Sequence, residues 1–236
     1  MTLQTKNVLI TGAYGGLGAA LARKYFLAGN NLCLVGRNEK KLLALKDELQ
    51  SLSSDGEVLL EACNLNDVES LVSLTQRVDN VDVLINCAGV FPVASLEDTD
   101  SETFLNCINT NLVAPFILIR EFSKSMKRNG WGRIINIASS SAYAGSPKTS
   151  AYCASKHALL GLSRSLYKEL KGHGVRVFTV SPGSIQTEMG KDVEKLGQLY
   201  DTFMTPEEVS DYIHYVTSFD GHMVSEEIRL NRMIVQ

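Results

Sequence analysis

Two residues with acid–base potential stand four positions apart in a segment that is predicted to be helical. They are Tyr152 and Lys156, in the run Ser-Ala-Tyr-Cys-Ala-Ser-Lys that begins at Ser150. Residues four apart share one face of a helix, so the ammonium can lie near the phenol oxygen. A free tyrosine titrates near pH ~10, and a nearby positive charge favours the phenolate and lowers that pKa. We therefore expect the pair to act as a proton donor tuned toward working pH.

A glycine cluster near the start of the chain is typical of a nucleotide-binding turn. The apolar run 7–11 is followed by Gly12, Gly16 and Gly18, and then by the helix-favouring segment 19–25. Gly12 permits a tight turn, Gly16 lets the backbone approach a pyrophosphate, and Gly18 lets the helix pack closely on the strand. The amino terminus of the following helix offers free amides to the phosphates. The spacing differs from a Walker loop, because no Gly-Lys-Ser/Thr follows; a strand–helix turn without any ligand is the alternative.

Length, composition and charge exclude several classes of protein. The 236 residues suit a single α/β domain spanning 1–236, and the composition of 44% hydrophobic and 21% charged residues is ordinary for a globular chain. The net charge of −3 and the absence of a basic tract argue against nucleic acid as a partner. No apolar run approaches the ~20 residues of a membrane span, so we expect no membrane partner.

The cysteines and the amino terminus favour a cytoplasmic location. The five cysteines are odd in number and contain no Cys-x-x-Cys, which suits a reducing compartment better than a disulfide scaffold or a zinc site. The first six residues lead directly into a predicted strand, so we expect no signal peptide. No metal site is expected.

Strand and helix patterns alternate along the chain. Apolar runs typical of buried strands occupy 7–11, 31–35, 58–62, 81–86, 133–138 and 175–180. Helical patterns lie near 17–29, 38–52, 67–78, 101–128 and 152–172. Such alternation predicts an α/β fold of the Rossmann type, with a doubly wound parallel sheet and helices on both faces. Ligands in these sheets bind outside the carboxyl ends of the strands, where most of the conspicuous polar residues fall.

Taken together, the motifs resemble those of the short-chain dehydrogenase/reductases over residues 5 to about 190. The matching elements, in order, are Thr11-Gly-Ala-Tyr-Gly-Gly-Leu-Gly18, Asn86-Cys-Ala-Gly89, Asn111, Ser139, Tyr152-x-x-x-Lys156 and Pro182-Gly183. The resemblance implies an oxidoreductase that transfers hydride between a nicotinamide and a carbonyl or alcohol. It implies a four-residue mechanism in which Tyr152 donates the proton and Ser139 binds the substrate oxygen. Lys156 then binds the nicotinamide ribose, and Asn111 holds a water that relays protons.

The end of the second strand indicates NADP(H) as the cofactor. In NAD-binding folds an acidic residue here accepts hydrogen bonds from the adenosine ribose. This chain has Gly36 at that position and then Arg37, whose guanidinium can pair with a 2′-phosphate. Many NADP-using relatives carry a second basic residue inside the glycine turn, where this chain has Gly15. Tyr14, beside it, is a candidate to cover the adenosine.

The resemblance also implies the remaining cofactor contacts. Asn64 stands where relatives usually carry an aspartate, and its amide oxygen can still accept a bond from the adenine amino group. Asn86 is expected to support the central sheet as well as the site. The full set of expected cofactor-binding residues is Gly12, Tyr14, Gly15, Gly16, Leu17, Gly18, Arg37, Asn64, Leu65, Asn86, Ala88, Gly89, Tyr152, Lys156, Pro182, Gly183, Ile185 and Thr187.

The function predicted on these grounds is that of an NADP-dependent ketone or diketone reductase. Alternatives are a catalytically idle dinucleotide-binding regulator on the same fold, a 3-oxoacyl thioester reductase, and a methyltransferase with a glycine-rich first turn, which would need neither Tyr152 nor Lys156. The substrate is expected to be a small carbonyl compound with an apolar flank. The candidate lining is Tyr143, Pro147, Met189, Leu196, Leu199, Tyr200, Phe203 and Met204. The family commonly forms dimers and tetramers, so a homodimer or homotetramer is expected; the predicted last strand at 226–233 lacks the family's frequent glycine-rich ending.

Overall fold

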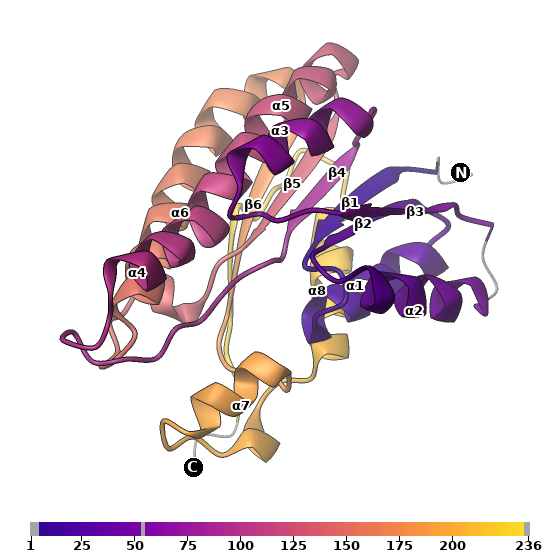
Figure 1. Ribbon diagram of the computed structural model, residues 1–236. Coiled ribbons are helices and arrows are strands. Elements are labelled where there is room, and N and C mark those ends of the chain that lie inside the picture. Colours follow the sequence, from indigo (N-terminus) through magenta and orange to yellow (C-terminus); the bar gives the residue numbers. More distant parts are fainter. Residues whose placement is uncertain (1–4, 53–54, 234–236) are drawn as a thin grey trace.

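A single seven-stranded sheet forms the centre of the molecule (Figure 1). The computed structural model describes residues 5–52 and 55–233. The strands are β1 (Asn7–Thr11), β2 (Asn31–Gly36), β3 (Val58–Ala62), β4 (Val83–Asn86), β5 (Gly132–Ile137), β6 (Val175–Pro182) and β7 (Glu227–Leu230). All neighbouring strands pair in parallel, in the order β3-β2-β1-β4-β5-β6-β7. This confirms the predicted α/β fold with its doubly wound parallel sheet.

Helices cover both faces of the sheet (Figure 1). They are α1 (Gly16–Leu27), α2 (Glu39–Gln50), α3 (Val68–Arg77), α4 (Ser101–Ile108), α5 (Ala114–Asn129), α6 (Ser150–Leu170), α7 (Glu188–Glu194) and α8 (Pro206–Thr217). Successive strand residues point to opposite faces. Val8 and Ile10 accordingly pack with α1, α2 and α8, whereas Leu9 packs with α3 and α5. Two apolar cores therefore sandwich the sheet.

The strand order reverses between β1 and β4, and this reversal places the site. The chain runs outward from β1 to β3 and then crosses to β4 on the other side of β1. Helices above neighbouring strands diverge at such a point, which leaves a crevice at the carboxyl ends. The residues that follow β1, β2, β4, β5 and β6 all open onto this edge.

The long helix predicted near 101–128 is continuous but not uniform. Between α4 and α5 the residues Asn109–Val113 form a π-helical turn. The whole stretch Ser101–Asn129 is long and apolar enough to cross a membrane by length and composition. The longest unbroken apolar run within it spans only residues 112–119, so the expectation about apolar runs is not contradicted. Leu118 and Phe122 of this helix are buried against the sheet, as in a helix that covers a core.

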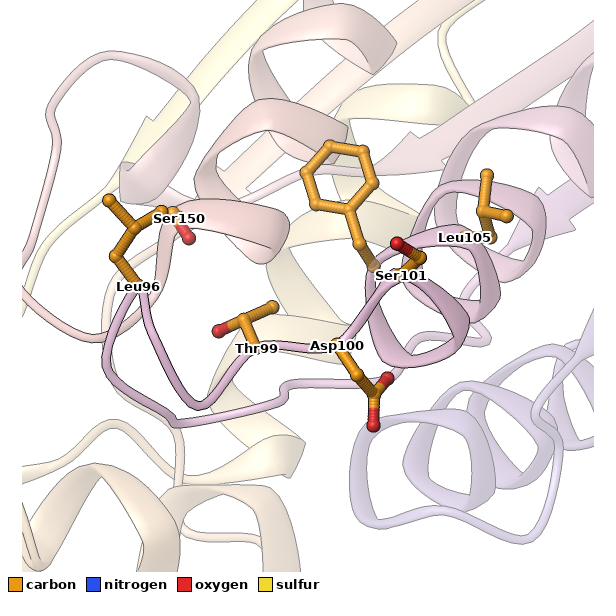
Figure 2. A pocket seen from close by; sticks show the side chains of 7 residues that line it. Leu96, Thr99, Asp100, Ser101, Leu105 and Ser150 are labelled. Atoms are coloured by element: carbon orange, nitrogen blue, oxygen red, sulfur yellow. The ribbon is translucent and has the colours of Figure 1, made fainter.

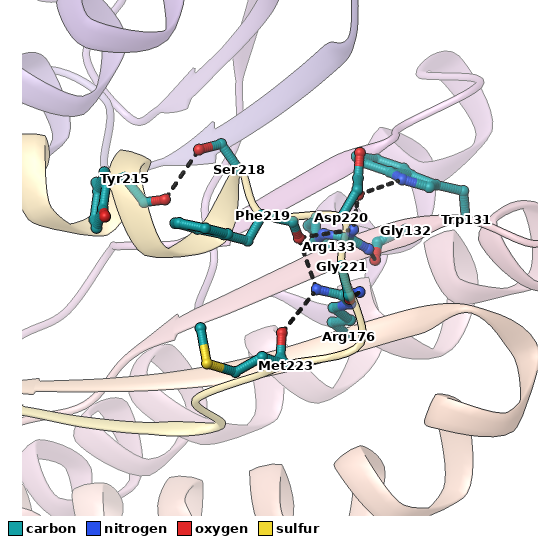
Figure 3. A network of polar contacts seen from close by, with 10 residues as sticks. All are labelled: Trp131, Gly132, Arg133, Arg176, Tyr215, Ser218, Phe219, Asp220, Gly221 and Met223. Atoms are coloured by element: carbon teal, nitrogen blue, oxygen red, sulfur yellow. Dashed lines mark hydrogen bonds and ion pairs between the residues drawn. The ribbon is translucent and has the colours of Figure 1, made fainter.

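An arginine network fixes the connection from α8 to β7 (Figure 3). Arg133, near the start of β5, is buried and forms an ion pair with Asp220. Arg176, in β6, donates to the carbonyl oxygens of Phe219 (2.6 Å), Gly221 and Met223 (3.3 Å). The network lies at the amino ends of the strands, opposite the crevice, and it anchors the chain just before the last strand.

Candidate active site

The turn after β1 is built from close backbone approaches that exclude side chains. Gly12 has a φ of +65°, and a Cβ on it would lie 2.8 Å from Cα of Ala88. A Cβ on Gly18 would lie 2.2 Å from the carbonyl oxygen of Gly12. The hydroxyl oxygen of Thr11 accepts hydrogen bonds from the amides of Cys87 (3.1 Å) and Ala88 (3.2 Å). The ends of β1 and β4 are thereby held together beneath the expected cofactor site.

The amino terminus of α1 is open to an anion. Gly15 precedes the helix without a side-chain cap, the first turn carries no acidic residue, and both Gly15 and Gly16 are exposed. The first amides of a helix have no intrahelical acceptor, and the helix dipole favours negative charge at this end. Leu17 is buried in the core, so only its backbone can face a ligand. These features fit the pyrophosphate of a dinucleotide.

The segment after β6 closes over the same turn. Pro182 is buried, and the amide of Gly183 donates to the carbonyl oxygen of Leu230 (2.8 Å). Thr187 accepts a hydrogen bond from the amide of Gly190 (3.1 Å) and so caps α7. A Cβ on Gly16 would lie 2.6 Å from Cγ2 of Thr187. The 183–187 segment, including Ile185, therefore borders the glycine turn. This position is the one expected of residues that contact the nicotinamide end of the cofactor.

The residues expected at the adenosine end lie at the ends of β2 and β3. Arg37 is exposed directly after β2, and no hydrogen bond or ion pair joins it to another residue of the described chain. Asn64 is exposed, and its amide oxygen accepts a bond from the amide of Asn66 (3.2 Å). A carbonyl oxygen has two lone pairs, so a second bond to an adenine amino group remains open. Leu65 is buried and offers only its backbone.

Asn86 supports the central sheet, as expected. It is buried at the end of β4, and its amide nitrogen donates to Oδ1 of Asn136 in β5 (2.8 Å). Asn136 in turn donates to Ser163 of α6 (2.9 Å). This chain of bonds ties two strands to the helix of Tyr152, which favours the sheet-supporting role. Oδ1 of Asn86 has no partner within residues 5–52 and 55–233.

Tyr152 and Lys156 lie together in the interior, as their spacing on α6 predicted. The two residues are 7% and 4% exposed. Nζ of Lys156 stands 5.6 Å from the centroid of the Tyr152 ring and donates to the carbonyl oxygen of Ile137 (2.8 Å). The phenol ring packs edge-on against Phe91, with centroids 4.7 Å apart. Both side chains are thus fixed by contacts with the ends of β4 and β5.

The predicted direction of the Tyr152 pKa shift was wrong. Burial raises the pKa of Tyr152 to about 12, and a hydrogen bond with Ser139 offsets only part of this rise. Burial also lowers the pKa of Lys156 to about 8. Desolvation disfavours the charged form of each group, and the Lys156 ammonium does not contribute the lowering of the phenol pKa that sequence spacing suggested. Tyr152 is therefore a neutral phenol near pH 7, which is the form that can donate a proton.

Asn111 is held in place by the π-helical turn. It is 1% exposed; its Nδ2 donates to the carbonyl oxygen of Val90 (3.0 Å) and to Oγ of Ser155 (3.0 Å). Its Oδ1 accepts from the amide of Val90 (2.9 Å). A Cβ on Gly89 would lie 3.4 Å from Oδ1 of Asn111 and 3.7 Å from Nζ of Lys156. Gly89 therefore leaves room for both polar groups above the end of β4.

Ser139 follows β5 and begins a single 3-10 turn, Ser140–Ala142. Its Oγ accepts a hydrogen bond from the amide of Ser141 (3.1 Å), and its side chain lies close enough to Tyr152 to lower the pKa of the phenol in part. The structure thus brings Ser139, Tyr152, Lys156 and Asn111 into one cluster. A neutral phenol beside a hydroxyl and an ammonium can protonate a carbonyl oxygen.

Three members of the site's support were not predicted from the sequence. Ser155, Phe91 and the backbone of Val90 hold Asn111 or Tyr152 in place. Ser155 lies inside the Tyr-x-x-x-Lys motif, which is the one sequence signal that could have drawn attention to it. The contacts of Phe91 and Val90 depend on how the loop after β4 packs on α6.

The side chain of Tyr143, which was expected to line the substrate pocket, is held by the last strand. The hydroxyl of Tyr143 donates to Glu227 of β7 (3.0 Å), and Arg229 lies over its ring at 4.3 Å. Glu227 also pairs with Arg164 of α6. Tyr143 therefore ties the turn that carries Ser139 to the last strand.

A hollow of about 440 Å³ lies between the loop before α4, α4 and the start of α6 (Figure 2). Its lining comes from the loop before α4, from α4 itself and from the first residue of α6: Leu96, Thr99, Asp100, Ser101, Phe104, Leu105 and Ser150. None of the four catalytic candidates lines it. The candidate active site is therefore identified from the polar cluster of Ser139, Tyr152, Lys156 and Asn111 and not from this hollow.

Comparison with known proteins agrees with the geometry. The family model for short chain dehydrogenase matches residues 6–196. The 3-oxoacyl-[acyl-carrier-protein] reductase FabG of Rickettsia conorii is 36% identical over 97% of this chain and 96% of its own length. A metagenomic short-chain oxidoreductase in complex with NADP is 29% identical, with a TM-score of 0.84 and 97% of both chains covered. A 4-hydroxyisoleucine dehydrogenase complexed with NADH is 28% identical, with a TM-score of 0.83 over 97% of this chain and 98% of its own.

The chain belongs to the short-chain dehydrogenase family. It is an oxidoreductase that acts on CH–OH or C=O groups. Solved relatives carry either NADP or NADH, so the choice of cofactor depends on this chain's own residues.

Proposed function

We propose that the protein is an NADP-dependent reductase of ketones or diketones. The observation that carries the proposal is the buried cluster of Tyr152, Lys156, Ser139 and Asn111 at the carboxyl ends of β4 and β5. This cluster lies at the edge of the sheet where the glycine turn and the 183–187 segment form a cradle for a dinucleotide.

Each polar group has one task in the proposed reaction. When bound, NADPH supplies the hydride. Tyr152 holds the proton for the carbonyl oxygen, and Ser139 orients that oxygen by a hydrogen bond. Lys156 binds the nicotinamide ribose through its ammonium, which is charged below a pH of about 8. Asn111, which is fixed by hydrogen bonds to Val90 and Ser155, holds the water that relays protons to Lys156.

Tyr152 carries the proton that reduction of a carbonyl consumes. A phenol with a pKa of about 12 keeps its proton at neutral pH, and reduction of a carbonyl requires a donor. Oxidation of an alcohol would require the phenolate, which is scarce in this environment. The form present near pH 7 is therefore the one that carbonyl reduction requires.

NADPH is proposed as the cofactor because Arg37 is exposed at the end of β2, beside Gly36, and is unpaired within residues 5–52 and 55–233. Charge-assisted hydrogen bonds to a phosphate contribute ~1.5–3 kcal/mol, which predicts a ten- to hundredfold preference in kcat/KM over NADH. Arg37→Ala should remove most of this preference, whereas Arg120→Ala on α5 should not. Equal efficiency with the two cofactors in the unmodified protein would contradict the assignment.

A second candidate substrate class is the 3-oxoacyl thioesters, favoured by the similarity to the Rickettsia reductase. The test is an NADPH-oxidation screen over alkyl and aryl diketones, a short 3-oxoacyl thioester, a charged sugar ketone and a steroid ketone. We expect the diketones or the thioester to be used most efficiently. Failure of every carbonyl compound together with tight NADPH binding would instead support the idle regulator.

We also propose that the protein is cytoplasmic and forms a homodimer or homotetramer. All five cysteines are free thiols, which suits a reducing compartment. Phe104, Leu105 and Phe116 are exposed apolar residues along α4 and α5, where another subunit could pack. Light scattering after size-exclusion chromatography would measure the assembly; a monomer at micromolar concentration would contradict it.

A further inference from the structure

The end of β2 is covered by an aromatic ring. A Cβ placed on Gly36 would lie 2.4 Å from Cε1 and 2.9 Å from Cδ1 of Tyr14. The turn that carries Tyr14 is tied to β2, because the amide of Ala13 donates to the carbonyl oxygen of Val35 (3.2 Å). Tyr14 is half-buried and packs against the core beneath α1 and α2. The ring therefore occupies the volume into which a side chain at position 36 would extend.

The ring, and not the backbone, explains the glycine at position 36. Gly36 is absent from the glycines with positive φ, so its backbone lies in a region that any residue can adopt. Its surroundings are otherwise those of an ordinary buried strand end. A carboxylate here, the group that would accept bonds from a ribose diol, requires Tyr14 to move first. This chain therefore lacks the carboxylate that would accept bonds from the ribose diol, and the ring of Tyr14 occupies the volume that such a carboxylate would need.

A second cation stands over the same ring. Nζ of Lys41, in the first turn of α2, lies 5.6 Å from the centroid of Tyr14. Lys41 forms no ion pair with a carboxylate in the described part of the chain. Arg37 is likewise unpaired within the described residues, so the chain carries one uncompensated positive charge directly after Gly36 and a second over the ring. An ammonium near a ring face is attracted to it, which limits where the lysine can reach.

We propose that Tyr14 and Lys41, together with Gly36, form a specificity element that selects a 2′-phosphorylated adenosine. The inference rests on the proposed use of NADPH and extends it to residues other than Arg37. Tyr14 excludes an acidic residue at position 36 and offers a flat surface to the adenosine. Lys41 supplies the second positive charge for the phosphate, in place of the basic residue that Gly15 does not provide.

The test measures binding of two adenosine fragments by calorimetry, so that turnover is not needed. Adenosine 2′,5′-bisphosphate carries the 2′-phosphate, and adenosine 5′-monophosphate lacks it. Lys41→Ala should weaken binding of the bisphosphate about tenfold, in a salt-dependent way, and leave the monophosphate within about twofold. Lys40→Ala is the matched control: this neighbouring exposed lysine should change neither by more than about twofold.

The ring is tested by a double-mutant cycle. Gly36→Asp alone should weaken both fragments at least about tenfold, because the new side chain displaces Tyr14. In the Tyr14→Ala, Gly36→Asp double variant the monophosphate should bind again, because the carboxylate then has room to accept from the ribose hydroxyls. Such a rescue is a non-additive effect that independent sites do not show. Thermal unfolding of each variant identifies any that fails to fold, in which case the Lys41 comparison decides.

The outcomes separate this inference from the proposed function. If the unmodified protein prefers the bisphosphate but Lys41→Ala behaves like Lys40→Ala, the element is overturned and the NADP assignment stands. Tight monophosphate binding by Gly36→Asp alone would overturn the role of the ring in the same way. If the unmodified protein shows no preference for the bisphosphate, both the NADP assignment and the element are overturned.

Discussion

Replacing Lys156 by methionine is expected to stabilise the fold while it abolishes turnover. Lys156 is 4% exposed, and its ammonium donates to the carbonyl oxygen of Ile137. No carboxylate of the described chain lies within ion-pair distance of it. Burial lowers its pKa from 10.5 to about 8, which shows that the fold disfavours the charge. Methionine has a similar length and no charge, so it removes this cost.

The magnitude follows from the pKa. Each pH unit corresponds to ~1.4 kcal/mol, so a fall from 10.5 to about 8 means that burying the ammonium costs roughly 3 kcal/mol at pH 7. Loss of the hydrogen bond to Ile137 lowers the free energy of unfolding by about 1 kcal/mol. The net gain of about 2 kcal/mol should raise the melting temperature by roughly 4–8 °C in a chain of this size.

The pH dependence of the stability separately tests whether charge burial at Lys156 destabilises the fold. The unfolded chain keeps the Lys156 proton up to pH 10.5, whereas the folded protein loses it near pH 8. The unfolded state therefore binds more protons between these values, and the stability of the unmodified protein rises with pH across this window. Methionine does not titrate, so its advantage should fall from about 2 kcal/mol near pH ~7 to almost nothing near pH ~9.5.

Thermal unfolding followed by circular dichroism at the two pH values measures this difference. Lys168→Met is the matched control, because Lys168 lies on the same helix but is exposed; it should change the melting temperature little at either pH. A lower melting temperature of Lys156→Met at neutral pH would refute the reasoning. An equal gain at both pH values would show that packing, and not charge burial, causes the effect.

Three further predictions concern the site and its support. Tyr152→Phe should lower kcat by about 10²–10⁴-fold and leave NADPH affinity, measured by fluorescence titration, nearly unchanged; near-normal turnover would contradict the proton-donor role. The kcat/KM for NADPH should fall as pH rises through about 8, because Lys156 loses its charge there, and a flat steady-state profile to pH ~10 would contradict this. Asp220→Asn should lower stability by about 1–2 kcal/mol in chemical denaturation, because it leaves the buried Arg133 without its ion pair; Asp211→Asn, which removes only a surface pair with Lys24, should cost less than half as much.

Local pattern predicted most of the fold because apolar periodicity is a local property. The predicted strand at 7–11 coincides with β1, and the run at 175–180 lies within β6. The helix α8 was not predicted, although Thr205 and Glu208 form a capping box at its start. That signature was present in the sequence, and Pro206 directly after Thr205 strengthens it.

Burial and orientation could not be predicted from spacing alone. The distance of four residues placed Lys156 near Tyr152, but it gave no measure of desolvation, which reverses the expected pKa shift of the phenol. Tyr143 was expected to face a substrate because it follows Ser139. Its partner Glu227 is 84 positions away, and only the pairing of β7 with β6 brings the two together.

The precision of the site arises from main-chain hydrogen bonds that no motif encodes. Oγ of Ser155 donates to the carbonyl oxygen of Tyr152 (2.7 Å) and accepts from Asn111 (3.0 Å). Asn111 in turn exchanges two hydrogen bonds with the backbone of Val90. The side chains of Asn111 and Ser155 are thus both hydrogen-bonded, and neither can turn without leaving a buried polar group unsatisfied. The π-helical turn at Asn111 is therefore the local distortion that lets the helix reach this network, as such turns often do at functional sites.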